Sequence, residues 1–181
     1  MRFGSIFGAA VLATGLVAPV QAAGCDQSAS KLWPATEGRP LLTEAYSNGR
    51  TCAAAVVTIV VRGADGKVLW TDAMAAEFLM TFVEAKTPAK MKAALADWLF
   101  QSHTFKSTGD LPEWKKGAEA PTVVGEFPFY PEAGVDQEGY SQIRAEKQPI
   151  FCYVQGMESL SCIGLSKDGA MTKIGVQTFP G

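Results

Sequence analysis

A nearly unbroken run of apolar residues, many of them β-branched, occupies positions 53–61. A short turn segment, Ala64-Asp65-Gly66, separates it from a second strand-like run at 67–71. β-Branched and aromatic residues favour pleated strands, and Asp-Gly between two such runs is typical of a hairpin. We therefore predict a hairpin with a three-residue loop that ends in a left-handed glycine, in which Val60 faces Trp70. The first strand is apolar throughout, which indicates a place in the middle of a sheet.

Two apolar segments near the C-terminus, 150–155 and 159–165, alternate in a way that defines their pairing. If they form a hairpin around residues 156–158, one face is apolar and Cys152 lies directly opposite Cys162. A shift of one residue would destroy both features, because it would turn every side chain to the other face. The pattern therefore predicts this register.

A third strand is expected at 171–179, after Lys167-Asp168-Gly169, which repeats the turn chemistry of the first hairpin. Continuing the same face places Cys162 opposite Ile174 and Leu160 opposite Val176. The C-terminal third is therefore predicted to be an antiparallel meander of three strands.

After the first hairpin, apolar residues recur twice at the helical spacing of three to four. The first stretch follows Thr71 and Asp72, either of which can cap a helix. The second begins at Thr87-Pro88, a cap residue followed by proline at the first helical position. The apolar positions are Met74, Phe78, Phe82 and Ala85 in the first stretch, and Met91, Ala94, Leu95, Trp98 and Leu99 in the second.

The remaining segments carry little periodicity and many glycines and prolines. Residues 26–50 are predicted to be a mostly irregular lead-in, and 104–149 an irregular segment with strand-like pieces only at 121–124 and 140–143. The expected fold is α+β: an antiparallel sheet of about five strands, with two helices packed on one face. The strands are those of the N-terminal hairpin and the C-terminal three-stranded meander.

The N-terminus is typical of an export signal. A positive start at Met1-Arg2 precedes an apolar stretch at 3–17, and Val20-Gln21-Ala22 offers a signal-peptidase site. We predict a secretory signal at 1–22 and a single domain at 23–181, with no membrane span after cleavage. An uncleaved anchor is the alternative, although the run is shorter than the roughly 20 apolar residues that cross a bilayer. A second alternative is a lipid anchor at Cys25, because Ala22-Ala23-Gly24-Cys25 resembles the end of a lipobox.

The chain has four cysteines, and an even number in an exported chain favours disulfides. Among the three connectivities we prefer Cys25–Cys52 and Cys152–Cys162, which pair neighbours in sequence. Lipidation of Cys25 would leave Cys52 without a partner. A periplasmic or secreted location follows from this reading, because disulfides persist in oxidising compartments.

The net charge is −2, with charges of both signs mixed along the chain, which disfavours nucleic acid as a partner. No phosphate loop or dinucleotide fingerprint is present, and acidic residues lack the spacing of a calcium loop. We expect neither a metal nor a cofactor. His103, the single histidine, is a weak candidate for a catalytic base, because a histidine past a helix end more often interacts with terminal carbonyls.

Four aromatic residues in the irregular segment are the candidate binding residues: Trp114, Phe127, Phe129 and Tyr130. Aromatic side chains are enriched at interaction hot spots, so we predict an exported accessory or binding protein whose partner is a protein or an envelope polymer. The alternative for these residues is that they fold back over the core. The alternative functions are a small periplasmic hydrolase that uses His103 and a purely structural envelope protein.

Overall fold

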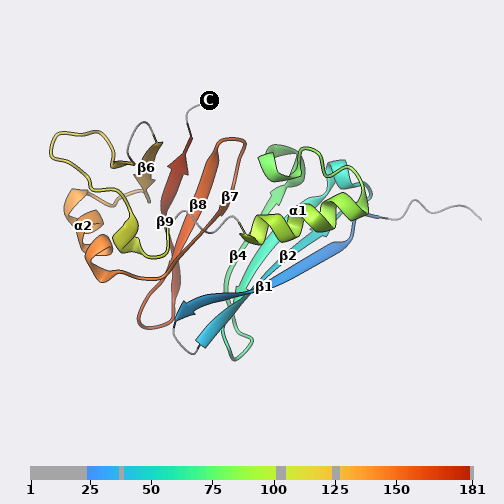
Figure 1. The fold of residues 1–181 in the computed structure, drawn as a ribbon, viewed down its shortest axis with the longest axis horizontal. Helices are drawn as coiled ribbons and strands as arrows, with labels where there is room; N and C mark the ends of the chain where they lie inside the picture. Colours follow the sequence, from blue (N-terminus) through green and yellow to red (C-terminus); the bar gives the residue numbers. More distant parts are fainter. Residues whose placement is uncertain (1–23, 37–38, 101–104, 124–126, 180–181) are drawn as a thin grey trace, which may run out of the picture.

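The computed structural model describes residues 24–36, 39–100, 105–123 and 127–179. These residues form two antiparallel sheets, with strand orders β1-β2-β3-β4 and β5-β6-β9-β8-β7. The two sheets lie beside each other, with α1 over the first and α2 at the far side of the second (Figure 1). The strands are β1 (Gln27–Thr36), β2 (Arg39–Asn48), β3 (Val56–Arg62), β4 (Val68–Ala75), β5 (Thr122–Val123), β6 (Phe127–Pro131), β7 (Ile150–Val154), β8 (Ser159–Leu165) and β9 (Met171–Thr178), and the α-helices are α1 (Pro88–Phe100) and α2 (Gln137–Glu146).

The α+β class is confirmed, but the single sheet of about five strands is wrong. The predicted irregular lead-in is a hairpin of two ten-residue strands, β1 and β2. Its inward positions on β2 include Thr43, Ala45 and Ser47, all of which are buried. Small and hydroxyl side chains occupy this core-facing row, so the two faces of β2 differ little in hydrophobicity. The sequence therefore lacks the apolar–polar alternation that would have predicted a strand.

The β3–β4 hairpin is confirmed, with Gly66 in the left-handed region at φ 79°. Its predicted pairing is wrong by one residue, because a β-bulge near the turn places Val61 rather than Val60 opposite Trp70. An extra residue on the second strand leaves the turn unchanged and shifts everything beyond it.

The same correction applies to the C-terminal meander. The predicted pairing of β7 with β8 is confirmed, including Cys152 opposite Cys162. A bulge on β9 then places Gly175, rather than Ile174, opposite Cys162 and shifts the pairs beyond it by one residue. Glycine fits this position because a Cβ there would lie 2.3 Å from the carbonyl oxygen of Tyr130. Glycine at this position thus lets β6 approach β9 closely.

Helix α1 is confirmed, and Thr87 Oγ1 accepts the Lys90 backbone N–H at 3.3 Å near its first turn. The helix predicted after Thr71 is wrong. Strand β4 continues to Ala75, which pairs with Val56, and two short 3₁₀ turns follow at Ala76–Phe78 and Met80–Phe82. Pairing with β3 therefore overrides the helical spacing of the apolar residues.

Residues 140–143 are also corrected, since they belong to α2 and not to a strand. Asp136 caps this helix by accepting the Gly139 N–H at 2.8 Å. The strand-like piece predicted at 121–124 is confirmed by β5, whereas β6 was not predicted, so the segment 104–149 is less irregular than expected.

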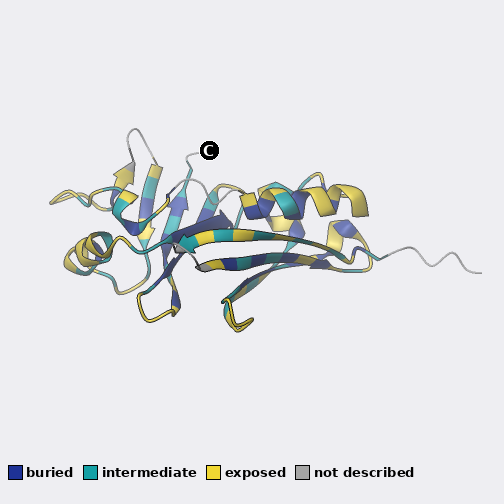
Figure 2. Ribbon diagram, turned by 60° about the horizontal axis from the view of Figure 1, so that its bottom comes forward, coloured by how far each residue is buried: buried dark blue, intermediate teal, exposed yellow. Residues whose placement is uncertain are grey.

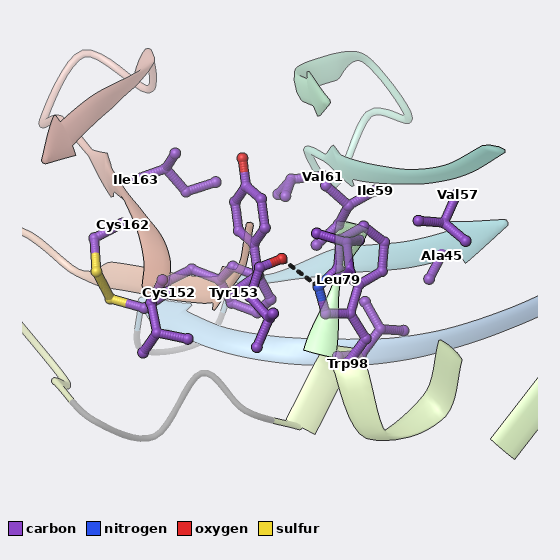
Figure 3. Close-up of a cluster of buried hydrophobic side chains, with 14 of the residues drawn as sticks. Ala45, Val57, Ile59, Val61, Leu79, Trp98, Cys152, Tyr153, Cys162 and Ile163 are labelled. Carbon is purple, nitrogen blue, oxygen red and sulfur yellow. Dashed lines mark hydrogen bonds between the residues drawn. A yellow bond between two sulfur atoms is a disulfide. The ribbon is translucent and has the colours of Figure 1, made fainter. Parts of the chain in front are cut away.

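One continuous core joins the two sheets. Buried residues gather where the sheets meet and along the side of α1 that faces them (Figure 2). Trp98 of α1 lies at the centre of this core, and its indole nitrogen donates to the carbonyl oxygen of Val154 at 2.8 Å (Figure 3). Its ring makes edge contacts with Phe82 and Tyr153 at centroid distances of 5.3 and 5.9 Å. The helix therefore attaches the first sheet to the β7 edge of the second.

Both predicted disulfides are present, Cys25–Cys52 and Cys152–Cys162. The first ties the start of β1 to the 3₁₀ turn before β3, and the second crosses directly from β7 to β8. Such bonds are typical of oxidising environments and are compatible with an exported small protein. The predicted signal at 1–22 lies outside the described residues. In the part of the chain that the structure describes, no helix is both long and apolar enough to cross a membrane.

Candidate functional site

The four candidate aromatic residues do not form one surface. Phe129 is fully buried, with its ring between those of Phe105 and Tyr140 at centroid distances of 6.1 Å each. Phe129 therefore belongs to the core, and its prediction as a binding residue is corrected. For Phe129 the structure agrees with the alternative given in the sequence analysis, in which these aromatic residues fold back over the core.

The other three candidates are dispersed. Tyr130 is 48% exposed and points to the opposite face of its strand from Phe129. Phe127 packs against Phe179 at 5.7 Å. Trp114 packs against Tyr140 at 5.8 Å, and its indole nitrogen donates to the carbonyl oxygen of Ala118. These positions remain candidates for contacts with a partner, but on separate parts of the molecule.

His103 lies outside the described residues, so its role as a catalytic base stays a prediction. Among the residues described, no three His, Cys, Asp or Glu side chains are grouped as metal ligands.

The best-formed site is a cavity of about 250 Å³ at the junction of the two sheets. It lies where β1, the end of α1 and the start of β7 meet, and sequence reasoning did not find it. Its walls are mostly apolar and include Trp33, Leu99, Phe105, Ile150 and Phe151.

Aromatic rings from both sheets form the cavity wall. Trp33 of β1 packs against Phe151 of β7 with a centroid distance of 5.4 Å. Phe105, Ile150 and Phe151 are buried, whereas Trp33 is partly exposed. The hydroxyl of Thr43, the one buried polar side chain of the described lining, donates to the carbonyl oxygen of Lys31 at 2.8 Å. The wall therefore offers apolar contact with its buried hydroxyl already satisfied.

Both charged residues of the described lining are lysines, Lys31 and Lys106. The ammonium nitrogen of Lys31 lies 3.4 Å from the ring centroid of Phe100, a cation–π contact. Lys106 is exposed. Within the described part of the chain the ion pairs are Arg62–Glu44 and Lys173–Glu132, so neither lysine of the cavity is paired with a carboxylate.

A capped turn holds the backbone at Lys106. One carboxylate oxygen of Asp110 accepts the backbone N–H groups of Ser107 and Lys106 at 2.8 and 3.0 Å. The carbonyl of Lys106 accepts the N–H of Ile150 at 3.4 Å. The hydrogen bond from the Ser107 backbone is the largest cause that lowers the pKa of Asp110 below its ordinary value. The Lys106 N–H, the Ser107 hydroxyl and the charge of Lys106 add to it, and burial opposes it.

Replacing Asp110 by Asn is expected to remove a pH-dependent part of the stability. Because folding lowers the pKa of Asp110, its contribution is present above the unfolded value of about 3.9 and is lost as the pH falls through the folded pKa. Urea unfolding from neutral pH to about pH 2 should therefore show wild type and variant converging at the acidic end. A difference that stays constant over this range would show that the ionised carboxylate is not responsible.

Two further cavities fit a ligand less well. One of about 520 Å³ lies between the β3–β4 and β8–β9 turns, where Asp65 and Glu146 oppose Lys147 and Lys167. The other, of about 160 Å³, lies beside α2, and three of its polar side chains, Gln137, Tyr140 and Arg144, donate to backbone carbonyls. The first is charged with both signs and the second is small, so neither selects an obvious ligand.

A partly buried group of hydrogen-bonded side chains also joins the sheets near Trp98. The Tyr153 hydroxyl donates to Asp72 Oδ2 at 2.9 Å and accepts from the Trp70 indole nitrogen at 3.1 Å. Burial raises the pKa of Tyr153 above its ordinary value, so the phenol stays protonated. Its ring is fully buried, so this group fits a structural role in joining β4 to β7.

Comparison with protein-family models, with curated proteins and with solved structures finds no match. The argument for function therefore rests on the geometry of the cavity.

Proposed function

We propose that this is an exported, disulfide-stabilised binding protein that holds a small, largely apolar ligand in the cavity between its two sheets. The observation that carries the proposal is the partly open cavity of about 250 Å³ with aromatic side chains in its wall. Ligand sites are typically concave, mostly apolar and bounded by a few polar groups, and they often lie where two substructures meet.

The size of the cavity limits the ligand. Its volume equals that of about eight water molecules, at roughly 30 Å³ each in the liquid. A fused bicyclic arene fits this scale. At roughly 0.3 to 0.4 kcal/mol per non-hydrogen atom, such a ligand would bind with a dissociation constant between about 0.1 and 1 mM.

Binding is favoured over catalysis by the chemistry of the wall. Thr43 supplies the one side-chain hydroxyl of the described lining, and that hydroxyl donates to a backbone carbonyl. A nucleophile needs a base within hydrogen-bond reach, and this pairing does not provide one. Export is supported by the two disulfides and by the N-terminal pattern of the sequence.

A protein or envelope-polymer partner is the second candidate. The exposed ring of Tyr130 favours it, because large aromatic side chains at the surface are common in recognition sites. A partner that docks through Tyr130 would use a surface separate from the cavity.

The test of the proposal uses 2-naphthamide, a neutral bicyclic probe. Titration followed by NMR is expected to shift the Trp33 indole signal and the methyl signals of Leu99 and Ile150, because these groups line the cavity. Methyl signals of Leu69 and Leu165, which line the larger cavity, serve as the internal control.

Two tryptophan variants provide the matched comparison. Trp33→Ala should weaken 2-naphthamide binding at least fivefold, about 1 kcal/mol, because it removes one ring of the wall. Trp114→Ala, which also removes a partly buried indole, should leave binding unchanged. Absence of saturable shifts at the cavity, or equal loss in both variants, would contradict the proposed function.

A further inference from the structure

We infer that the natural ligand is an anion, a compact aromatic body that carries a carboxylate or an equivalent acidic group. Its ring would lie against the partly exposed Trp33, which Phe151 supports from the core side, and its charge would be held by Lys31 and Lys106 at the opening of the cavity. The inference rests on the proposed function, since it names the class of ligand that the same cavity takes.

The charge of the cavity differs from that of the chain. The whole chain has a formal net charge of −2, yet both charged residues of the described cavity lining are positive. The larger cavity between the turns, by contrast, is lined by residues of both signs. An anion is therefore attracted to the first cavity specifically and not to the protein in general.

Both ammonium groups are available to a ligand. Each lysine presents three N–H donors, and neither takes part in the ion pairs of the described residues. Lys31 lies over the Phe100 ring, a contact that holds its side chain near the mouth and leaves its donors for an acceptor. Lys106 is exposed, and its backbone is held by Asp110.

The Asp110 carboxylate lies near Lys106 and is engaged mainly with the backbone of the turn. Its oxygen that accepts the Lys106 N–H also accepts the N–H and the hydroxyl of Ser107, and the charge of Lys106 makes only the smallest contribution to its lowered pKa. An incoming acidic group would therefore compete with this weak attraction and not with an ion pair.

The apolar wall accounts for the body of the ligand. The Trp33 and Phe151 rings are tilted at 55° to each other, and Phe105 lies on the same wall. Aromatic faces and edges favour contact with a further ring. A cavity of about 250 Å³ accommodates one or two fused rings but not the full length of a long acyl chain.

The test compares 2-naphthoate with 2-naphthamide at about pH 7.5, where the carboxylic acid is fully ionised. The two probes share one ring system and nearly one size, and they differ in charge. We expect isothermal titration to give about tenfold tighter binding of the naphthoate, as charge-assisted hydrogen bonds at a partly exposed site would produce. Salt at about 0.5 M should narrow this ratio.

Variants of the two cavity lysines test whether these residues cause the preference for naphthoate over naphthamide. Lys31→Gln and Lys106→Gln should each weaken naphthoate binding several-fold and leave naphthamide binding unchanged, whereas Lys31→Arg should keep the preference. Lys90→Gln, at an exposed lysine of α1, is the matched control and should change neither probe. Melting temperatures of the variants close to wild type would show that the fold is intact.

The outcomes separate the two proposals. Equal binding of both probes at the cavity would overturn the anion inference while the proposed function stands. The anion inference would also be overturned if Lys90→Gln reduced the preference for naphthoate as much as Lys31→Gln and Lys106→Gln do. The preference would then come from the overall charge of the protein. If neither probe shifts the cavity signals, the proposed function fails and the inference fails with it.

Discussion

Trp98→Ala is expected to lower the free energy of unfolding by about 4 to 8 kcal/mol, a large part of the stability of a small domain. Removing a fully buried tryptophan costs about 3 to 5 kcal/mol, and the carbonyl of Val154 loses its indole donor, which adds about 1 to 3 kcal/mol. Small domains are stable by only about 5 to 15 kcal/mol. Urea unfolding followed by circular dichroism would measure the loss.

Trp98→Phe separates the loss of ring packing from the loss of the indole hydrogen bond. It keeps an aromatic ring near Phe82 and Tyr153 but removes the N–H group, so its cost should be clearly smaller than that of the alanine variant. If Trp98→Ala costs less than about 1 kcal/mol, α1 is not the element that joins the sheets, since core truncations of this kind cost several times more.

Phe129→Ala is expected to destabilise the protein by about 3 to 5 kcal/mol, because its ring is fully buried between Phe105 and Tyr140. Its neighbour provides the matched control. Tyr130→Ala should cost less than about 1 kcal/mol, because that ring is 48% exposed. Thermal unfolding of the two single variants measures the contrast.

Comparing the stability losses of Phe129→Ala and Tyr130→Ala also shows which face of β6 is packed in the core. Comparable losses in both variants would show that Tyr130 is packed by something beyond the described residues. A small loss for Phe129→Ala would return that residue to the list of candidate contacts, as the sequence suggested.

The C-terminal meander and α1 were predictable because each has two agreeing signals. In β7 and β8 the apolar face and the facing pair Cys152 and Cys162 require the same register. In α1 the cap at Thr87 and the buried stripe that contains Trp98 define one start and one face. Agreement between local chemistry and long-range pattern is the condition under which a sequence specifies an element.

The two bulges were not predictable from the turns. Both hairpins have the loop that the Asp-Gly chemistry indicates, and in both the second strand gains one residue beyond it. On β9 the reason lies outside the hairpin, because Gly175 must accept the close approach of Tyr130. A contact between distant segments thus decides a register that the local sequence leaves open.

The β1–β2 hairpin and β6 were missed for different reasons. The inward row of β2 uses threonine, serine and alanine, which resemble loop residues in composition. In β6 the prolines at 128 and 131 suggested a break, yet the strand forms with Pro131 as its last residue and Pro128 opposite the two-residue strand β5. Recognising β6 would also have shown that Phe129 and Tyr130 face opposite ways.

The cavity could not be predicted, because its residues are far apart in the sequence and none belongs to a motif. Trp33 and Phe151 come into contact only when the two sheets pack together. The signal that was present is modest: a lysine beside an apolar residue at both 31–32 and 105–106. Such pairs are too common to indicate a site before the fold is known.

Each sheet is built from one continuous part of the chain, residues 27–75 for the first and 122–178 for the second. Chains emerge from the ribosome N-terminus first, so β1 to β4 and α1 are complete before β7 has been synthesised. During that interval the partner of the Trp98 indole, the Val154 carbonyl, does not yet exist. Until β7 joins them, the first sheet and α1 therefore leave an apolar flank uncovered, so the N-terminal half of the chain cannot complete its own core.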